Sequence, residues 1–594
     1  MKKTVLLISI LLGTLFQNYA QHQNLITNVH NRNVTNLSGK WRYLTDVNRE
    51  RRGYEKDMVP IEKWDIHEYN FPTSDWLYVP GDWNTQRENL FYYDGHVWYR
   101  KKFTYDKDEN KRLFIYFGAV NYKAEVYLND ILLGKHVGGF TPFNFEIPDS
   151  LLQEENSLVV LADNVREFDG VPSFRTGWWN YGGITRDVLL VELNNTFIRD
   201  YYVQLDKNSP NTIKGFVQLD GQALSQNVAI EIPELNKTIK GKTNKDGKYE
   251  FKEKIANVDY WDVDNPKLYK VKVVSETDTV QDKIGFRTIA TEGTDILLNG
   301  KPIFLRGISI HEENPLGEGR AWSREHAMVL LNRAKELNCN FVRLAHYPHN
   351  EHIYRVADEM GMLVWEELPL FWAIDWESEK AYKIAENMAT EMVTRDKNRA
   401  SIIIWSVANE TGDHDARNKF LTGMIEHTRS MDDTRLISAA LLKNAKKSTK
   451  KVKVVDDYLG KYSDIISINE YFGWYQGLPQ IKDSIRWDIQ FNKPFLFSET
   501  GAGALQGFHG DSLTRWTEDY QSYYFRETIE MCERIPTLRG LSPWILNDFL
   551  SPQRVFPYIQ DNFLRKGLIS DRGEKKEAFY ILRDYYKKKA ERNR

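Results

Sequence analysis

The 594-residue sequence has only two cysteines, Cys339 and Cys532. Both fall in segments expected to be helical, where they are either buried and free or bridged, so cysteine chemistry is not the basis of function. Neither sign of charge predominates, since 80 basic and 83 acidic residues give a formal net charge of -3. This balance argues against nucleic acid or an anionic membrane as the partner, because both are recognised by basic surfaces.

Long hydrophobic runs are absent after the first twenty residues, which argues against a membrane anchor in the remaining sequence. The first twenty residues, MKKTVLLISILLGTLFQNYA, place two lysines before an apolar segment too short to span a bilayer. We interpret residues 1–20 as a signal peptide. The chain is therefore expected to be exported, either to the periplasm or out of the cell.

The sequence has no low-complexity linker and no internal repeat, so its organisation is indicated by changes in hydrophobic period. Residues 21–195 alternate polar and apolar residues in runs such as RLFIYFGAV and DVLLVEL, which predicts a jelly-roll β-sandwich. Residues 196–290 contain short strands such as TIKGFVQL, and their length suits an immunoglobulin-like β-sandwich.

Residues 291–594 change to strands that alternate with helices. Helical patterns cover Arg324–Leu337, Glu351–Met360 and Glu377–Arg399. Eight apolar strand candidates occur, namely IFLRGIS, FVRLAH, LVWEEL, IIIWSVANE, LISAA, IISINEY, FLFSE and LRGLSPW. This number of β/α units predicts a TIM barrel. The lysine-rich run at 443–453 is expected to be a solvated surface loop.

Two glutamates stand at the ends of buried strands in this barrel. Glu410 lies at the C-terminal end of the fourth strand and Glu499 at that of the seventh, so the two lie on opposite sides of the barrel axis. Either one alone could cap a helix or pair with an arginine. Together, two carboxylates across a cleft are what cleavage of a glycosidic bond requires. Glu366 and Glu367 also end a strand, and we interpret them as structural.

Other polar and aromatic residues follow the same strand ends and gather at the same rim, where His346 is predicted to contact a substrate hydroxyl. These residues are Arg343 and His346 after the second strand, Asn469, Tyr471 and Tyr475 after the sixth, and Trp544 after the eighth. A metal-dependent hydrolase would need several His and Asp ligands at these positions, and His346 alone is obviously available.

Long motifs along the chain resemble glycoside hydrolase family 2. The first region carries LSGKWRY, VPGDWN, HVWYRKKF and NYGGITRDVLL, and the barrel carries FVRLAHYPHNEHIYRVADEMGMLVWEELP, WSVANE and FSETGAG. The resemblance covers nearly the whole chain beyond residue 20. It implies a hydrolase that acts on oligosaccharides or other glycosides.

The resemblance also implies roles for individual residues. Glu410 would be the general acid/base and Glu499 the nucleophile of a retaining double displacement, with the carboxyl groups about 5–5.5 Å apart. Asn409 would hold the hydroxyl next to the anomeric carbon, and Tyr471 would hydrogen-bond to the nucleophile. The neighbouring charge should raise the pKa of the acid. No metal or organic cofactor is expected.

Within the family, INEYFGWYQG is most similar to the β-glucuronidase branch, which grips the substrate carboxylate with an Asn-x-Lys pair. Lys566 fits the lysine of that pair, but Leu564 stands at the asparagine position, with Asn562 and Arg565 nearby. A second departure is Gly177, where that branch carries an aspartate.

The sequence thus favours an exo-acting β-glucuronidase in polysaccharide breakdown, with Arg554, Arg565 and Lys566 as candidate cations for the carboxylate and Asn562 beside them. A β-galactosidase would need no such cation and is the main alternative, followed by a β-mannosidase. An inactive carbohydrate-binding protein is the alternative of another class, and intact Glu410 and Glu499 argue against it. The sequence leaves open whether the chain forms a homo-oligomer.

Overall fold

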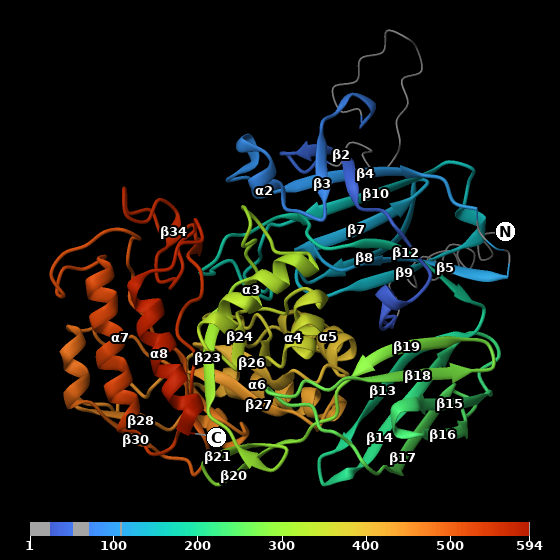
Figure 1. The fold of residues 1–594 in the computed structure, drawn as a ribbon. Coiled ribbons are helices and arrows are strands. Elements are labelled where there is room, and N and C mark those ends of the chain that lie inside the picture. Colours follow the sequence, from blue (N-terminus) through green and yellow to red (C-terminus); the bar gives the residue numbers. More distant parts are fainter. Residues whose placement is uncertain (1–23, 51–70, 107, 109, 593–594) are drawn as a thin grey trace, which may run out of the picture. The chain divides into compact units, whose positions relative to one another are not determined.

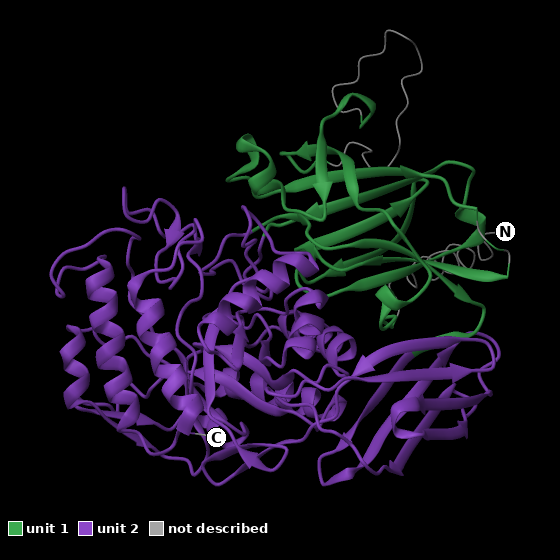
Figure 2. Cartoon of the chain, in the orientation of Figure 1, with its two compact units in different colours: residues 1–165, 181–199 green, residues 166–180, 200–594 purple. Residues whose placement is uncertain are grey.

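The computed structural model describes residues 24–50 and 71–592, except residues 107 and 109. The predicted signal peptide lies outside the described residues. Two compact units make up the chain (Figure 2). Unit 1 contains residues 1–165 and 181–199, and unit 2 contains residues 166–180 and 200–594.

Unit 1 is a sandwich of antiparallel sheets (Figure 1). Its six-stranded sheet contains, in order, β3 (Trp76–Val79), β2 (Gly39–Asp46), β4 (His96–Phe103), β10 (Asn156–Asp163), β7 (Lys123–Leu128) and β8 (Ile131–Val137). The four-stranded sheet contains β1 (Val34–Asn36), β12 (Val188–Asn194), β5 (Lys111–Phe117) and β9 (Phe143–Ile147). Two short strands, β6 (Val120–Asn121) and β11 (Gly183–Ile184), pair beside them.

The alternation seen in the sequence produces the core of this sandwich. Val160 of β10 lies opposite Tyr99 of β4 and Val126 of β7. These side chains pack in one cluster with Ile115 and Leu190 of the other sheet. Because successive side chains of a strand point to opposite faces, the polar residues between them are left outside this cluster. The predicted β-sandwich is confirmed.

Unit 2 begins with the predicted immunoglobulin-like sandwich. One sheet contains β13 (Phe197–Asp206), β14 (Ser209–Asp220) and β17 (Lys248–Lys254). The other contains β16 (Lys237–Lys242), β15 (Asn227–Ile232), β18 (Tyr269–Ser275) and β19 (Thr279–Ile284). Along β19, exposed and buried residues alternate without exception, as expected for a strand with one face in a core.

A closed barrel of eight strands follows, and it contains the eight strands predicted from the sequence. Its strands are β23 (Leu305–Ile310), β24 (Phe341–Leu344), β25 (Leu363–Glu367), β26 (Ile402–Asn409), β27 (Leu436–Leu441), β29 (Ile466–Asn469), β31 (Phe495–Glu499) and β32 (Leu538–Leu541). Neighbouring strands run parallel. Smaller sheets are formed by β20 (Ile289–Glu292), β21 (Asp295–Leu298) and β22 (Lys301–Pro302), by β28 (Val452–Val455) and β30 (Arg486–Ile489), and by β33 (Phe549–Leu550) and β34 (Phe563–Leu564).

An α-helix follows six of the eight barrel strands, whereas only short 3-10 helices, Tyr458–Lys461 and Pro479–Ser484, follow β27 and β29. The α-helices of the described residues are α3 (Arg324–Glu336), α4 (Glu351–Met360), α5 (Glu379–Asp396), α6 (Asp415–Met431), α7 (Glu518–Glu533) and α8 (Glu577–Arg592), with the short α2 (Trp83–Gln86) in unit 1. Helix α5 begins later than predicted because Ser378 caps it, its side chain accepting a hydrogen bond from the Ala381 backbone N–H, and it ends at Asp396 rather than Arg399. Cys532 lies in α7, but Cys339 does not lie in a helix, because α3 ends before it; both thiols are buried and free.

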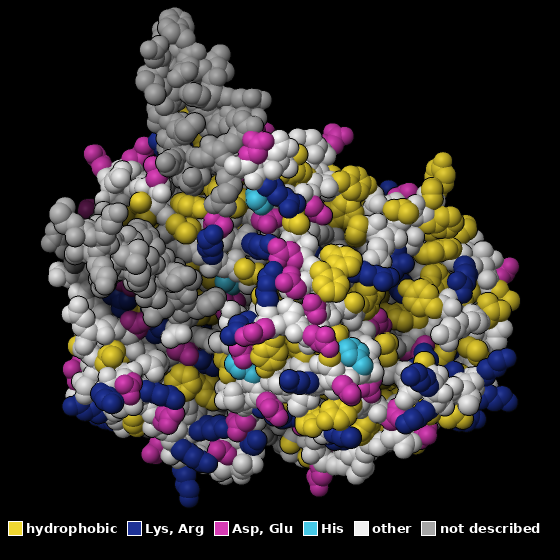
Figure 3. Space-filling model, turned by 180° about the vertical axis from the view of Figure 1, so that it is seen from behind, with side chains coloured by type: hydrophobic (Ala, Val, Ile, Leu, Met, Phe, Trp, Pro, Cys, Tyr) yellow, Lys and Arg dark blue, Asp and Glu magenta, His cyan; other side chains and the backbone are white. Residues whose placement is uncertain are grey.

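The surface agrees with the balanced composition. On the face drawn in Figure 3, basic and acidic side chains alternate over most of the described surface. Among the described residues, no helix has the length and apolar character that crossing a membrane requires.

Candidate active site

A pocket of about 440 Å³ lies at the C-terminal ends of the barrel strands, and all of its lining belongs to unit 2. Each of the eight barrel strands either ends in a lining residue or is followed by at least one. The lining consists of Gly177, His311, His346, Phe371, Trp372, Asn409, Glu410, Leu442, Lys443, Asn469, Glu470, Tyr471, Tyr475, Gln476, Glu499, Trp544, Phe549, Arg554, Leu564 and Lys566. Most of the residues predicted from the sequence are therefore brought together here.

Glu410 directly follows β26, whose residues are all buried. Its backbone has φ +52°, the left-handed region that a non-glycine residue seldom adopts, so the chain bends sharply at the carboxylate. The carboxylate accepts hydrogen bonds from Trp372 Nε1 at 2.7 Å and Asn469 Nδ2 at 3.0 Å. Burial and the charge of Glu499 together raise the pKa of Glu410, despite these two hydrogen bonds. This environment suits a group that donates a proton.

Glu499 ends β31 and is held by two donors of different kinds. Arg343 Nη1 donates to its Oε1 at 2.6 Å, and the Tyr471 hydroxyl donates to its Oε2 at 2.5 Å. The two donors bind one oxygen each and hold the carboxylate in place. The environment suits a nucleophile, in contrast to that of Glu410.

Arg343 is fully buried and also binds Glu367, with Nη2 2.8 Å from Oε1. Burial alone would raise the pKa of Glu367, but the charge of Arg343 and the hydrogen bond with His346 lower it to about 2. Glu367 and Glu366 are buried outside the pocket lining, and Glu366 pairs with Arg395 at 3.4 Å. Their contacts agree with the structural role expected for them.

The side chain of Asn409 presents a donor to the pocket. Its Oδ1 accepts hydrogen bonds from Arg343 at 2.7 Å and Asn469 at 3.0 Å. Its Nδ2 is buried and has no hydrogen-bond partner among the residues that the structure describes. A sugar hydroxyl could accept from this group.

Aromatic rings form one wall of the pocket. His346 stacks on Trp544 with ring centroids 4.7 Å apart, and burial lowers the pKa of this histidine. His311 packs against Phe549 at 4.2 Å. His311 was not among the predicted residues, although it directly follows β23 and therefore stands at a strand end like the residues that were predicted.

Another part of the pocket lining is cationic. Lys566 is only 4 % exposed, and its Nζ donates to the Tyr475 hydroxyl at 2.7 Å. The same Nζ lies 3.9 Å from the ring centroid of Tyr471. Within the described part of the chain, no carboxylate lies within 4.0 Å of it. Burial lowers the pKa of Lys566, as expected for a cation without a paired anion.

The structure does not bring Asn562 or Arg565 into the pocket lining, in contrast to the prediction. Arg565 turns to the carboxylates of Asp571 and Asp548 instead, which satisfy its charge. Asn562 has φ +68° and lies in the turn between β33 and β34.

The lysine-rich run is only partly the solvated loop that was predicted. Lys446, Lys447, Lys450 and Lys451 are exposed. Lys443 instead lines the pocket, where it forms an ion pair with Glu470. Glu470, which follows the next barrel strand, attracts Lys443 to the pocket, and the local composition does not reveal this partner.

Asp548 fixes the segment that carries Lys566. Its carboxylate accepts from the Gly567 backbone N–H at 2.8 Å and from the buried Lys576 Nζ at 2.9 Å. Replacing Asp548 with Ala will leave Lys576 buried without its anion. The apparent unfolding temperature, measured by circular dichroism, should therefore fall by roughly 5–10 °C. The control is Asp584→Ala, at an exposed pair with Arg583, which should change it by no more than about 2 °C. Equal effects of the two changes would contradict this assignment.

The Trp372→Phe substitution tests whether the hydrogen bond from Trp372 controls the pKa of Glu410. The indole N–H favours the ionised carboxylate, so its loss will raise the pKa of Glu410 further. Because the acid must be protonated, the basic limb of the kcat/KM profile should move to higher pH. Trp376→Phe is the control, since Trp376 packs against Phe420 outside the pocket lining. A basic limb that stays in place or moves to lower pH would count against this role.

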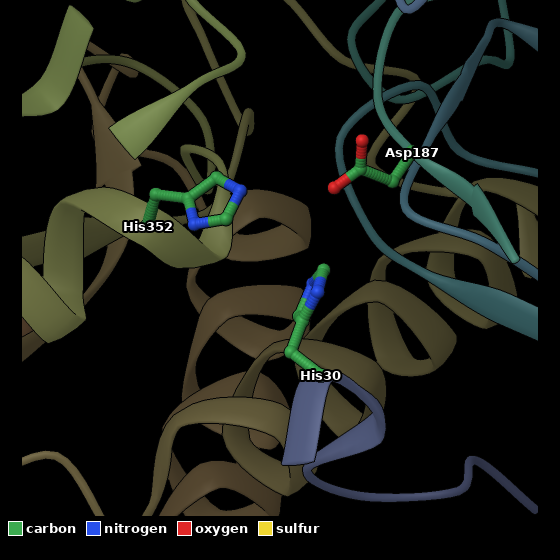
Figure 4. A group of neighbouring side chains, drawn as sticks. All are labelled: His30, Asp187 and His352. Carbon is green, nitrogen blue, oxygen red and sulfur yellow. The ribbon is translucent and has the colours of Figure 1, made fainter. Parts of the chain in front are cut away.

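Residues that could hold a metal lie outside the pocket lining. Asp483, Glu527 and Glu530 form an acidic cluster in unit 2. In unit 1, a ligand atom of His30 and one of Asp187 lie within 4.8 Å of each other (Figure 4, which also draws His352 of unit 2). We assign no metal to these side chains.

A TIM barrel that places two carboxylates in a pocket at its strand ends, joined to two β-sandwiches, is typical of a glycoside hydrolase. Residues 34–194 match the sugar binding domain of glycosyl hydrolases family 2, residues 196–287 match a further domain of that family, and residues 289–590 match its TIM barrel domain. The chain belongs to glycosyl hydrolases family 2.

Relatives and solved structures extend over most of the chain. A β-glucuronidase of Paenibacillus borealis is 25% identical over 609 residues, covering 93% of this chain and 96% of the relative. A β-D-glucuronidase structure from Dictyoglomus thermophilum superposes with a TM-score of 0.78 at 25% identity, over 95% of this chain and 99% of the other. A family 2 β-galacturonidase structure from Eisenbergiella tayi, bound to glycerol, superposes with a TM-score of 0.79 at 25% identity, over 94% of this chain and 96% of the other.

Proposed function

We propose that this protein is an exo-acting, retaining β-glucuronidase that releases terminal glucuronic acid from oligosaccharides or other glycosides. The observation that carries the proposal is Lys566, a buried cation that shares one pocket with Glu410 and Glu499 and has no carboxylate partner among the described residues. A uronic acid has a carboxylate at C6, and a neutral hexose has none. The relatives named as β-glucuronidases support the same choice.

In the first step, Glu499 attacks the anomeric carbon while Glu410 transfers its proton to the departing glycosidic oxygen. The C–O bond to the leaving group breaks, and an ester between the sugar and Glu499 forms. In the second step, Glu410 accepts a proton from water, whose oxygen attacks the anomeric carbon and releases Glu499. Two inversions leave the β configuration unchanged.

The environments of the two glutamates match these changes of role. Before the first step, burial and the charge of Glu499 keep the pKa of Glu410 high. Esterification removes that charge, so the pKa of Glu410 falls and the same group can act as a base. The Asn409 Nδ2 group would donate to the hydroxyl next to the anomeric carbon.

Hydrolysis of matched aryl β-glycosides tests the proposal. The glucuronide, galacturonide, galactoside, mannoside and glucoside are compared at one pH, with Glu499→Gln enzyme as the blank. The galacturonide belongs in this set because it has the same C6 carboxylate and one similar structure is a β-galacturonidase. Preferred turnover of the glucuronide is expected. Preferred turnover of the galactoside would refute the assignment to uronic acids, and preferred turnover of the galacturonide would change the sugar while keeping the carboxylate site.

We further propose that residues 1–20 direct export and that the enzyme takes part in the breakdown of polysaccharides outside the cytoplasm. Support comes from the lysines and apolar run of MKKTVLLISILLGTLFQNYA. Sequencing the amino terminus of protein recovered from the periplasm or the medium tests this. A mature chain that starts near residue 21 is expected, and an intact Met1 in the cytoplasm would contradict it.

A further inference from the structure

Residues 166–180 belong to unit 2, and their two phenylalanines, Phe168 and Phe174, are exposed. Phe168 is 66 % exposed and Phe174 is 62 % exposed, although phenylalanine is among the residues that proteins most often bury. The two rings contact each other, with centroids 6.2 Å apart and an angle of 24° between their planes. They therefore form one apolar surface, which we call the phenylalanine pair, and such a surface commonly marks a binding site.

Phe168 is held in place by the residues on either side of it. The Lys380 Nζ group donates to Glu167 Oε2 at 2.6 Å and to Asp169 Oδ1 at 3.0 Å. Lys380 lies in α5. The chain just before and just after Phe168 is therefore tied to one helix of the barrel, and the ring is presented to solvent from a defined position.

Phe174 is held beside Trp372, which lines the pocket. On one side of it, the Ser173 hydroxyl donates to the Ala373 carbonyl at 2.6 Å. On the other side, the guanidinium carbon of Arg175 lies 5.5 Å from the centroid of the Trp372 ring. Both neighbours of Phe174 thus contact the chain that follows β25. The phenylalanine pair is fixed next to the pocket, although neither ring belongs to its lining.

The general acid decides where the leaving group departs. In the proposed mechanism, Glu410 gives its proton to the glycosidic oxygen, so the first unit of the leaving group lies against this carboxylate. Trp372 Nε1 donates to Glu410 Oε2 at 2.7 Å. Trp372 is half-buried, whereas the phenylalanine pair is exposed. This series of contacts therefore leads from the acid, past Trp372, to the surface of the unit.

Gly177 leaves space beside Trp372. It lines the pocket, and a Cβ atom at this position would lie 3.8 Å from Phe371 Cζ and 3.9 Å from Trp372 Cη2. These are ordinary van der Waals distances, so any longer side chain would occupy the space next to both rings. The aspartate that the family resemblance predicts here is missing, and the space beside Trp372 is left to a ligand.

We propose that Trp372 and the phenylalanine pair bind the sugar chain that departs with the glycosidic oxygen. One face of a pyranose ring consists of C–H groups, so it packs against an aromatic ring and removes apolar area from water. Trp372 contacts the first unit of this chain, and Phe174 and Phe168 contact the units that follow. The substrate is therefore an oligosaccharide with at least two sugar units beyond the uronic acid. This inference rests on the proposed function and chooses oligosaccharides among its substrates.

Hydrolysis of short and long glucuronides tests the proposal. The short substrate is methyl β-glucuronide, and the long ones are trisaccharides with β-glucuronic acid on the nonreducing unit of cellobiose or of laminaribiose. In Phe174→Ala, kcat/KM for at least one trisaccharide should fall by roughly 3- to 15-fold, the range of a lost aromatic contact, and that for the methyl glucuronide by less than about twofold. Because this ring lies away from the reacting atoms, the loss should appear as a higher KM with kcat unchanged.

The conservative variant Phe174→Trp keeps a ring at this position and should retain most of the activity on the trisaccharides. The control is Tyr580→Ala, which removes an exposed ring of α8 outside the pocket lining and should change neither kcat/KM. Equal losses for short and long substrates in Phe174→Ala, or no loss for either trisaccharide, would overturn the inference. The proposed function would still stand in both cases, since it fails only if the wild-type enzyme hydrolyses none of the glucuronides.

Discussion

Replacing Glu499 with Gln will lower kcat/KM for an aryl β-glucuronide by at least about 10⁴-fold, on the scale seen when a catalytic nucleophile is removed. The amide keeps the shape of the side chain, but it cannot form the ester with the anomeric carbon. The measurement is release of the aryl group by the purified variant, with circular dichroism and ligand binding to establish that the pocket is intact.

Tyr471→Phe is the matched comparison for this change. It removes only the hydroxyl that donates to Glu499 Oε2 and leaves the nucleophile in place. A smaller loss, on the order of 10- to 100-fold, is expected from one hydrogen bond to a charged group. If Glu499→Gln retained activity comparable to that of Tyr471→Phe, Glu499 would not be the nucleophile.

Glu410→Ala will have an effect that depends on the leaving group. An aryl group that departs as a stable phenolate needs little protonation, so its first step should be slowed only slightly. For a poor leaving group such as an alkyl or sugar alcohol, kcat/KM should fall by about 10²- to 10⁴-fold. The measurement is kcat/KM for a series of glucuronides whose leaving groups differ in pKa, with a steeper dependence in the variant than in the wild type.

The second step gives an independent check on Glu410. Without the general base, the ester on Glu499 should accumulate with good leaving groups, and added azide should speed its breakdown because azide attacks without losing a proton. The product should be the β-glycosyl azide. Equal losses for all leaving groups, with no response to azide, would contradict the acid/base role.

The barrel could be predicted from the sequence because each of its strands is an apolar run with a polar residue at its end. In β26 and β31, the buried runs stop at Asn409 and Glu499, so the positions of Glu410 and Glu499, the two glutamates proposed to be catalytic, followed from the strand count. The helix limits were less accurate, since Ser378 rather than the hydrophobic pattern decides where α5 begins.

The set of cationic residues that line the pocket could be predicted only in part. Lys566 and Arg554 line the pocket, but Arg565 does not, and nothing in the order of these residues separates them. Their side chains are directed by long-range partners, such as Asp548 and Asp571 for Arg565, which a local pattern does not reveal. Trp372 was not predicted for a related reason. Its hydrogen bond to Glu410 joins residues that follow two different barrel strands.

The most direct test of the account is proton NMR of an aryl β-glucuronide during the first minutes of hydrolysis by the wild-type enzyme. If Glu499 is the nucleophile, β-glucuronic acid will appear first, and the α anomer will follow only as the free sugar mutarotates. Initial release of the α anomer would show a single displacement and contradict the nucleophilic role of Glu499, and no hydrolysis of the glucuronide would contradict the proposed function.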